Sequence, residues 1–302
     1  MNQHFVNFKT CALSLLLLLI ACNPGNVKAE ASVNNNDDQI INAQANISQV
    51  ERVVTLTSLT SDIIHQLDPN KLVGISGSRL LAEDPRFQDL PTVSQGRTPP
   101  DLEKIVALEP DLVIGAEGFS DRTLNKLEEL GIQTIATDVN SWQALEETTI
   151  TLANAISADP QPLLERYQTF IPEELNTATS TLVLVSRQPI LAPNKNSWAG
   201  DLLTKFQAKN LVADLQGNSE FGGYVTLSAE KVLTANPETI LLVDPGREGI
   251  EEQLKAEPFW QELQATQSDR VYVFDYFGLV NPGSIAKIEE SCQQLAKILS
   301  SE

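Results

Sequence analysis

A ten-residue pattern occurs twice in this chain, and each copy leads directly into an apolar run typical of a buried β-strand. The copies are residues 101–110, Asp-Leu-Glu-Lys-Ile-Val-Ala-Leu-Glu-Pro, and residues 228–237, Ser-Ala-Glu-Lys-Val-Leu-Thr-Ala-Asn-Pro. Each begins with a residue that favours the helix N-cap, places a glutamate in the first turn and ends at proline, which cannot continue a helix. Because the Glu-Lys pair stands at the same distance from the proline in both copies, we expect two lobes that are built alike.

Short β-rich runs alternate with helical patterns from residue 51 onward. The strand candidates are Val53–Leu56, Lys71–Ile75, Asp111–Ile114, Gln133–Ala136, Thr181–Val185, Thr239–Val243 and Val271–Phe274. The helix candidates lie near 60–67, 101–108, 121–130 and 283–299. This alternation predicts an α/β fold in which each lobe has a mostly parallel sheet flanked by helices. A chain of 302 residues has room for two such lobes.

The segment between the two halves has a helical pattern and no strand signal. It covers residues 141–178 and contains Pro160 and Pro172 as points of interruption or kinking. We interpret it as a long rigid helix that joins the lobes. The expected organisation is therefore an N-terminal lobe over 51–140, the interlobe helix over 141–178 and a C-terminal lobe over 179–302.

The N-terminus has the pattern of an export signal. Lys9 is followed by an apolar run from Cys11 to Ala21, which is shorter than the ~20 residues needed to span a bilayer and ends at Cys22. The sequence Leu-Ile-Ala-Cys resembles the lipobox of bacterial lipoproteins, so we expect residues 1–21 to be removed and Cys22 to carry the lipid anchor. An ordinary secretory signal is the alternative. Residues 22–50 lack any apolar period and are expected to form a disordered tether.

Composition narrows the classes of function. The chain has 21 Lys and Arg against 40 Asp and Glu, so a polyanion such as nucleic acid is not an expected partner. With the signal removed and Cys22 lipidated, Cys292 has no disulfide partner, and its helical context indicates a small buried side chain. His65 is then the only histidine, which argues against a zinc or manganese site.

Enzyme motifs are absent from the sequence. It contains no Gly-x-Ser-x-Gly elbow and no phosphate-binding loop, and a single histidine leaves little for general-base catalysis. We therefore expect a binding protein without a cofactor, and a periplasmic hydrolase that uses carboxylates alone is the alternative.

Four segments resemble the class III substrate-binding proteins of ABC importers, the receptors for ferric siderophores, cobalamin and haem. They are Pro99–Ile114, Leu130–Ile132, and Phe259–Leu263 together with Arg270–Tyr272. The resemblance extends from about Glu51 to the C-terminus. It implies two lobes of βα units beside a rigid helix, a ligand in the shallow cleft between the lobes, and a glutamate on each lobe that pairs with arginines of the permease. Those glutamates correspond to Glu103 and Glu230.

The resemblance also suggests where the ligand is held. The segment around Arg97 resembles the place where hydroxamate-siderophore receptors carry an arginine that contacts the iron-bound oxygens, and a guanidinium suits anionic oxygens. The other expected contacts are aromatic residues in loops that face the cleft, namely Phe119, Trp198, Phe221, Tyr224, Tyr276 and Phe277. Trp142, Tyr167 and Trp260 are assigned to packing.

Departures from the family pattern bear on the ligand. Phe206 stands about where enteric cobalamin receptors have the disulfide partner of the last helix, and the tryptophan that they carry near Gly96 is missing. A glycine near 221–223 replaces a tryptophan of the hydroxamate receptors. We therefore expect a monomeric, lipid-anchored receptor in the periplasm or cell envelope that delivers a ferric siderophore to an inner-membrane ABC permease dimer and its ATPase. Cobalamin and haem are the alternatives.

Overall fold

The computed structural model describes residues 49–95, 98–173, 179–216, 219, 222–244 and 249–299. The expected signal peptide, Cys22 and the tether up to residue 48 lie outside these ranges. Val50 is already buried, and its carbonyl oxygen accepts a hydrogen bond from Lys71 Nζ at 2.7 Å, so the folded body includes the last residue of the expected tether. Of the helices in the described ranges, none combines the length and the apolar character of a membrane span.

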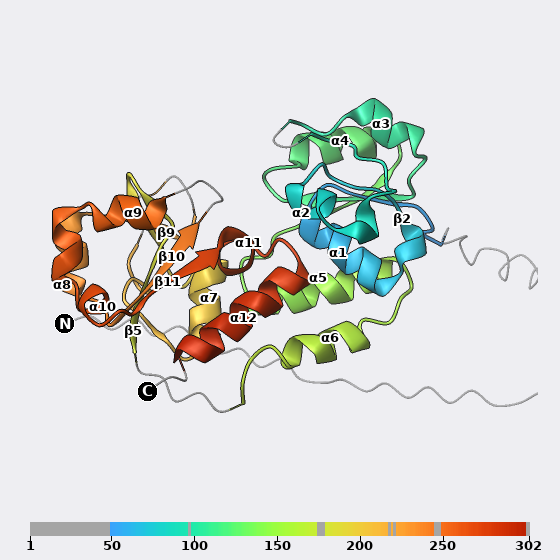
Figure 1. Ribbon diagram of the computed structural model, residues 1–302. Helices are drawn as coiled ribbons and strands as arrows, with labels where there is room; N and C mark the ends of the chain where they lie inside the picture. Colours follow the sequence, from blue (N-terminus) through green and yellow to red (C-terminus); the bar gives the residue numbers. More distant parts are fainter. Residues whose placement is uncertain are drawn as a thin grey trace, which may run out of the picture. The chain divides into compact units, whose positions relative to one another are not determined.

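The N-terminal lobe contains a four-stranded parallel sheet (Figure 1). Its strands, in the sheet order β2-β1-β3-β4, are β2 (Leu72–Gly74), β1 (Val53–Thr55), β3 (Leu112–Ala116) and β4 (Gln133–Thr137). The helices are α1 (Ser58–Leu67), α2 (Arg79–Ala82), α3 (Leu102–Ala107) and α4 (Asp121–Glu129), with 3-10 turns at Pro69–Lys71 and Pro85–Phe87. Val53, Val54 and Ile114 are fully buried because helices cover both faces of the sheet.

The C-terminal lobe repeats this topology. Its parallel sheet has the order β8-β5-β10-β11, formed by β8 (Lys209–Asn210), β5 (Ser180–Leu184), β10 (Thr239–Asp244) and β11 (Val271–Asp275). Counted along the chain within each sheet, both lobes have the order 2-1-3-4. The helices are α7 (Trp198–Lys205), α8 (Ala229–Ala235), α9 (Ile250–Lys255), α10 (Gln264–Gln267), α11 (Tyr276–Leu279) and α12 (Ile285–Leu299), with a 3-10 helix at Pro258–Glu262.

One part of the C-terminal lobe has no counterpart in the sequence-based expectation. It is a small antiparallel sheet of β6 (Ser186–Arg187), β7 (Ile190–Pro193) and β9 (Tyr224–Leu227). These strands are short, and two of them follow β5 almost without interruption. Their apolar period is therefore too brief to be distinguished from the end of the preceding strand.

The ten-residue repeat is confirmed at the level of the backbone. Asp101 caps α3 by accepting hydrogen bonds from the backbone N–H of Glu103 (3.1 Å) and Lys104 (3.2 Å). Ser228 caps α8 in the same way through Lys231 N–H, at 3.2 Å. The residue before each proline has a positive φ, 46° at Glu109 and 40° at Asn236, and each copy leads into the third strand of its sheet.

The expected interlobe helix over 141–178 consists of two helices, and the break between them lies at the interruption expected near Pro160. They are α5 (Trp142–Ala155) and α6 (Gln161–Gln168). α5 ends because Ser157 adopts a positive φ of 58°, and Pro160 then begins α6 because its ring fixes a helical φ and needs no N–H partner. The buried Lys71 ammonium donates to the carbonyl of Ile156 at 2.8 Å and so stabilises the negative end of α5.

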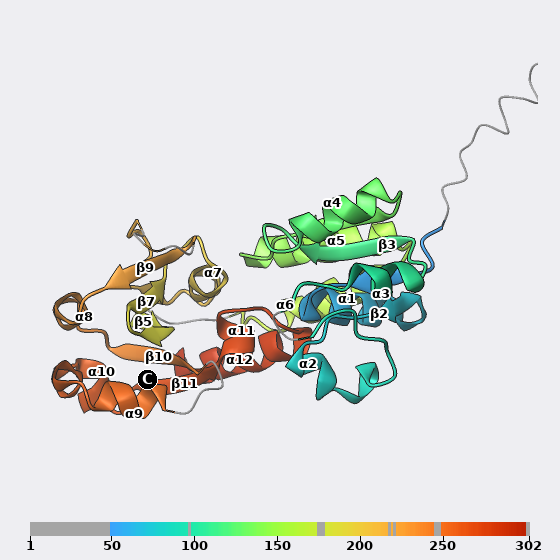
Figure 2. The ribbon, with the colours of Figure 1, turned by 90° about the horizontal axis from the view of Figure 1, so that it is seen from above.

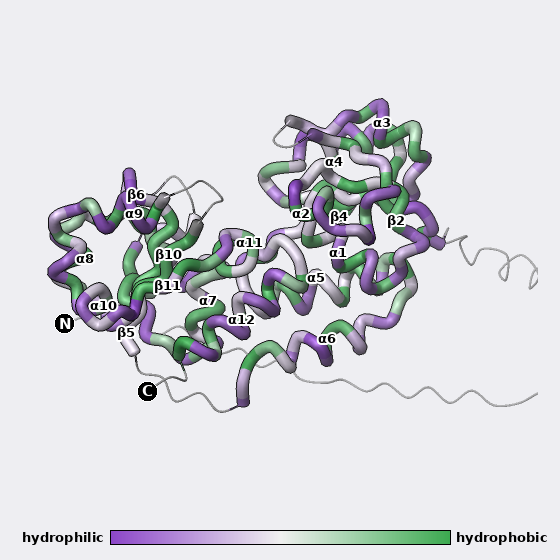
Figure 3. The backbone as a smooth tube through the Cα atoms, viewed as in Figure 1, coloured by the Kyte–Doolittle hydropathy of each residue, from purple (hydrophilic) through white to green (hydrophobic). Residues whose placement is uncertain are grey.

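A single hydrophobic cluster extends through both lobes. It includes residues of α1, α5, α6, α7 and α12 together with inward-facing residues of both parallel sheets. Trp142 of α5 stacks on Trp198 of α7, with ring centroids 6.2 Å apart, and its other sides meet Tyr167 and Phe170. Figure 3 shows β10 and β11 as mostly hydrophobic strands. The lobes therefore share one core across the connecting helices.

Two aspartates bind helix ends across this shared core. The backbone N–H of Trp142, at the start of α5, donates to Asp201 of α7 at 2.7 Å. The backbone N–H of Ile285, at the start of α12, donates to Asp62 of α1 at 2.8 Å. Figures 1 and 2 show that α12 begins on the side of α1, where this bond forms, and runs back toward the C-terminal lobe. Each lobe thus supplies the acceptor for a helix that belongs to the other half of the chain.

Asp62 should be the most sensitive of these positions. Its side chain is 1% exposed and also accepts from the Arg86 guanidinium at 2.9 Å. Asp62→Ala would leave the buried Ile285 N–H without its acceptor and would leave Arg86 paired with Asp84 alone, so we expect the free energy of unfolding to fall by about 3 kcal/mol. Urea unfolding measures the loss. Glu83→Ala, which removes an exposed ion pair with Arg79, should change stability by less than about 0.5 kcal/mol. An equal loss in the two variants would contradict the role given to Asp62.

Candidate ligand-binding site

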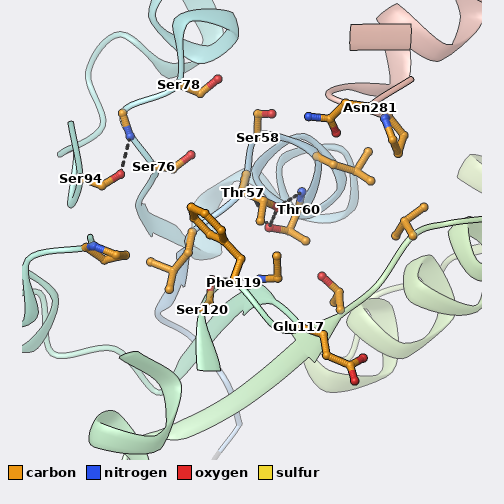
Figure 4. A pocket seen from close by; sticks show the side chains of 18 of the residues that line it. Thr57, Ser58, Thr60, Ser76, Ser78, Ser94, Glu117, Phe119, Ser120 and Asn281 are labelled. Carbon is orange, nitrogen blue, oxygen red and sulfur yellow. Dashed lines mark hydrogen bonds between the residues drawn. The ribbon is translucent and has the colours of Figure 1, made fainter. Parts of the chain in front are cut away.

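A cavity of about 650 Å³ opens at the carboxyl ends of the N-lobe strands (Figure 4). Every strand of that sheet contributes the residues that follow it, including Thr57 and Ser58 after β1, Ser76 and Ser78 after β2, Glu117 and Phe119 after β3, and Asp138 after β4. The strand order reverses between β1 and β3, and the crevice outside such a point is where open α/β sheets bind ligands. The position of the cavity therefore follows from the topology of the sheet.

Hydroxyl groups dominate the wall beside α1 and the loop after β2. Some of them hold the backbone in place. Ser94 Oγ accepts from Gly77 N–H at 3.0 Å, Ser120 Oγ accepts from Ala116 N–H at 3.1 Å, and Thr57 caps α1 through Thr60 N–H at 3.2 Å. Thr57 and Thr60 also share a hydroxyl hydrogen bond of 2.7 Å. These bonds fix the loops that shape the cavity.

Two of the expected aromatic residues line this cavity from different parts of the chain. Phe119 follows β3 and is 82% exposed, because a turn at Gly118, with a positive φ of 73°, directs the next residue outward. Phe277 of α11 lines the cavity together with Asn281 and Pro282, which also belong to the C-terminal half. An exposed phenylalanine beside a polar cavity offers an apolar surface to a ligand.

Three other aromatic predictions have different outcomes. Tyr276 packs edge-on against Phe277 at 5.4 Å and is not among the described lining residues. Tyr224 lines a separate hollow of about 200 Å³ with Asn194 and Asn196, and burial raises the pKa of its hydroxyl to about 12. Phe221 lies outside the described residues.

The placement of Trp198 in the cleft is wrong. Its side chain is 3% exposed and its indole N–H donates to the carbonyl of Gly278 at 2.9 Å. Ser197 caps α7 through Gly200 N–H, which puts Trp198 in the first helical turn, on the side that faces Trp142. Trp198 is therefore a core residue. The packing roles of Trp142, Tyr167 and Trp260 are confirmed, since all three are buried.

Arg97 and the expected anchor residue Cys22 also lie outside the described residues. The described neighbours of Arg97 in the sequence, Ser94 and Thr98, line the cavity. The assignment of Arg97 as a ligand contact stays a prediction.

Glu103 and Glu230 occupy equivalent positions. Each is the second helical residue after its N-cap, in α3 and α8, and each is exposed. Neither carboxylate has an ion-pair partner within the part of the chain that the structure describes. Both side chains are therefore available to an external cation, in addition to their interaction with the positive helix end.

The two remaining candidates from the sequence are structural. Cys292 is buried in α12, and burial raises the pKa of its thiol to about 12. His65 lies half-buried in α1 with its ring 5.1 Å from that of Phe87, and burial, then the nearby Arg86, lowers its pKa. Within the described residues, no group of three or more His, Cys, Asp or Glu side chains is arranged to hold a metal ion.

The hydroxyl-rich wall was missed in the sequence. Ser58, Ser76 and Ser78 are small polar residues that follow strands β1 and β2, and their types alone do not distinguish a ligand site from a turn. The sequence feature that could have identified them is their position directly after predicted strands. The carboxyl ends of parallel strands meet at one edge of a sheet, so the polar residues after each predicted strand form the first candidates for a site.

Substitutions should separate the core tryptophan from the cavity phenylalanine. Trp198→Ala removes a buried ring from the shared core and should lower the free energy of unfolding by about 3–5 kcal/mol. Phe119→Ala removes an exposed ring and should change it by less than about 0.5 kcal/mol. Chemical denaturation followed by far-UV circular dichroism tests both. A large loss for Phe119→Ala would mean that this ring supports the fold.

Comparison with known proteins places the chain in a family. The profile of the periplasmic binding protein family matches residues 53–276. The vitamin B12-binding protein of Salmonella typhimurium is 29% identical over 206 residues, which cover 65% of this chain and 73% of that protein. The iron-uptake system-binding protein of Bacillus subtilis is 22% identical over 300 residues, covering 88% and 90%.

A solved structure shows the same fold. The periplasmic heme-binding protein HutB of Vibrio cholerae superposes with a TM-score of 0.67 at 22% identity, over 82% of this chain and 98% of that one. The two α/β lobes and their parallel sheets agree with this neighbour. The chain therefore belongs to the periplasmic binding protein family, in the class III form that serves ABC importers as substrate-binding proteins.

Proposed function

We propose that this chain is the receptor of an ABC importer that captures a ferric siderophore and delivers it to the membrane permease. The observation that carries the proposal is the cavity at the strand ends of the N-lobe, whose lining combines a hydroxyl-rich wall with the exposed ring of Phe119 and the half-buried ring of Phe277. A siderophore has the matching character, because its oxygens bind iron and its scaffold is partly apolar. The cavity volume of about 650 Å³ lies in the range of small-molecule sites, roughly 300–1,000 Å³.

Haem fits the described lining less well. A haem receptor that ligates the iron uses a histidine, cysteine, methionine or tyrosine side chain. None of these types occurs among the described residues that line the cavity. Cobalamin remains a second candidate, and the specific observation in its favour is the 29% identity to a vitamin B12-binding protein. Its flat ring system would pack on Phe119 and Phe277 as an apolar siderophore scaffold does.

Several observations support binding without catalysis. The described lining has no histidine, cysteine or lysine, and its carboxylates, Glu117 and Asp138, are both exposed. General acid–base work by a carboxylate at neutral pH requires a raised pKa, and burial is the usual means of raising it. The relatives named above are binding proteins by description.

Glu103 and Glu230 are proposed to dock the loaded receptor on arginines of the two permease subunits. Their support is the matched position on equivalent helices of the two lobes and the exposure of both carboxylates. Long-range attraction between acidic and basic surfaces speeds encounter and fixes orientation. The lipid anchor at Cys22 would keep the receptor near the membrane, so that each delivery starts from a short distance.

The ligand can be identified by isothermal titration calorimetry of the full-length chain in mild detergent. The ligands are ferric hydroxamate, ferric catecholate and ferric citrate chelates, haemin and cobalamin. We expect one ferric chelate to bind saturably, and Phe119→Ala to weaken that binding by about 1–2 kcal/mol because the scaffold loses an apolar contact. Saturable binding of cobalamin alone would show that the ligand is cobalamin and not a siderophore. The absence of binding by every ligand would overturn the receptor role.

The docking proposal predicts a separation of transport from binding. The double variant Glu103→Ala, Glu230→Ala should abolish uptake in cells and stimulation of the importer ATPase, while chelate affinity stays within about twofold because neither residue lines the cavity. Glu252→Ala, a glutamate exposed in the first turn of α9, is the matched control and should leave uptake unchanged. A parallel loss of affinity in the double variant would disprove the docking assignment.

A further inference from the structure

Three serine hydroxyls on one wall of the cavity have no hydrogen-bond partner among the described residues. Ser76 gives the strongest evidence for a missing partner, since this residue is 7% exposed and its Oγ is buried without a hydrogen-bond donor or acceptor. Ser58 and Ser78 are half-buried, and Ser78 makes no capping bond although it precedes α2. Figure 4 shows Ser76 and Ser78 on the loop after β2, with the Ser76 hydroxyl turned toward Ser58 at the start of α1.

The same wall contains the N-terminus of α1. This helix is ten residues long, so its first turn carries the partial positive charge of a full helix end. Thr57 accepts the N–H of Thr60, whereas the N–H groups of Ser58 and Leu59 have no acceptor among the described residues. No acidic side chain occupies the first turn. Backbone N–H groups can only donate, and each serine hydroxyl can also donate, so the wall can present several donors to one anionic oxygen.

Among the charged residues that the structure describes in the cavity lining, the cation adjoins the loop that carries two of the serines and the two carboxylates do not. Arg79 directly follows Ser78 and lines the cavity, and its exposed guanidinium lies 3.7 Å from Glu83. The two carboxylates come from the ends of the other strands. Glu117 follows β3 and points away from the three serines (Figure 4), and Asp138 follows β4 and accepts from Asn140 at 2.8 Å.

We propose that Ser58, Ser76 and Ser78, with the first N–H groups of α1, form an oxyanion subsite that holds a carboxylate or phosphate group of the captured ligand. The inference rests on the proposed receptor function, because it names the chemistry of the ligand in that same cavity. A buried hydroxyl without a partner is costly, and an anionic oxygen seated against α1 supplies the missing acceptor. Hydrogen bonds to an ionised acceptor are about twice as strong as neutral ones, and a helix N-terminus adds to them.

The subsite can be tested with simple probes on the full-length chain in mild detergent. Calorimetric titration with inorganic phosphate and with citrate, each against chloride at matched ionic strength, should show saturable binding of at least one. Phosphate binding alone assigns a phosphate group to the ligand, and citrate binding alone assigns a carboxylate. Saturation by neither probe would refute the subsite.

Substitutions show whether phosphate or citrate binds at the three serines. Ser76→Ala should weaken binding of the anion about tenfold or more, while its melting temperature stays equal or rises because an unpaired buried hydroxyl has been removed. Ser58→Asp places a carboxylate at the first helical position, so it should abolish anion binding and keep or raise the melting temperature. Ser268→Ala, an exposed serine of the C-terminal lobe, is the control and should bind as the wild type does. Wild-type affinity in both Ser76→Ala and Ser58→Asp would refute the assignment.

The outcome is separable from that of the proposed function. If no chelate, haemin or cobalamin binds but an anion binds in a Ser76-dependent manner, the subsite stands and the proposed receptor function falls. If a chelate binds equally well to the wild type and to Ser76→Ala and neither anion binds, the receptor function stands and the subsite falls.

Discussion

The shared core around Trp142 is the contact on which the rest of the structure depends. Trp142 stacks on Trp198 of the C-terminal lobe and also packs against Tyr167 and Phe170 of the connecting region. Its backbone N–H is held by Asp201, and the start of α12 is held by Asp62. A hinge motion would have to break packed rings and buried hydrogen bonds together, and packed interiors do not deform continuously. The shared core therefore opposes a large hinge motion between the lobes.

Stiffness has a consequence for binding. A receptor that closes by a large hinge motion spends part of the interaction energy on ordering, whereas a preorganised cleft loses little. The loops that shape the cavity are held by local bonds such as Ser94 to Gly77 and Ser120 to Ala116. Preorganisation of this kind suits a bulky ligand that stays partly exposed. It also leaves the permease to recognise the receptor through surface residues, as proposed for Glu103 and Glu230.

Charge acts on two length scales in this protein. The whole chain has a formal net charge of −19, which favours a basic docking partner and opposes the approach of an anionic ligand. That long-range repulsion is screened over about 8–10 Å at physiological ionic strength. At the cavity wall the local groups dominate, namely the N-terminus of α1, the unpaired serine hydroxyls and Arg79. An acidic body and an oxyanion subsite are thus compatible, because the subsite acts at contact distance.

The sequence by itself determined the elements and their repetition. Apolar runs predicted seven of the eight strands of the two parallel sheets, with the two-residue β8 missed. The pattern at 101–110 and 228–237 predicted matched helices, because strand burial and helix capping depend on neighbours within a few residues. The glutamates at Glu103 and Glu230 and the aromatic residues Phe119 and Phe277 were found in the same way, from their positions after strands or in first turns. The break near Pro160 was also visible in the sequence, although its result, two helices instead of one, was not.

Only the tertiary structure decided which side of each loop faces the core. Trp198 looked like a cleft residue, yet α7 turns it against Trp142, more than fifty positions earlier in the chain. Asp62 is an unremarkable helical aspartate in the sequence and becomes a buried acceptor for a helix 223 residues away. The unpaired hydroxyl of Ser76 has no sequence signature either. Each of these three features depends on which distant segment packs beside the residue, and a local sequence pattern does not specify that contact.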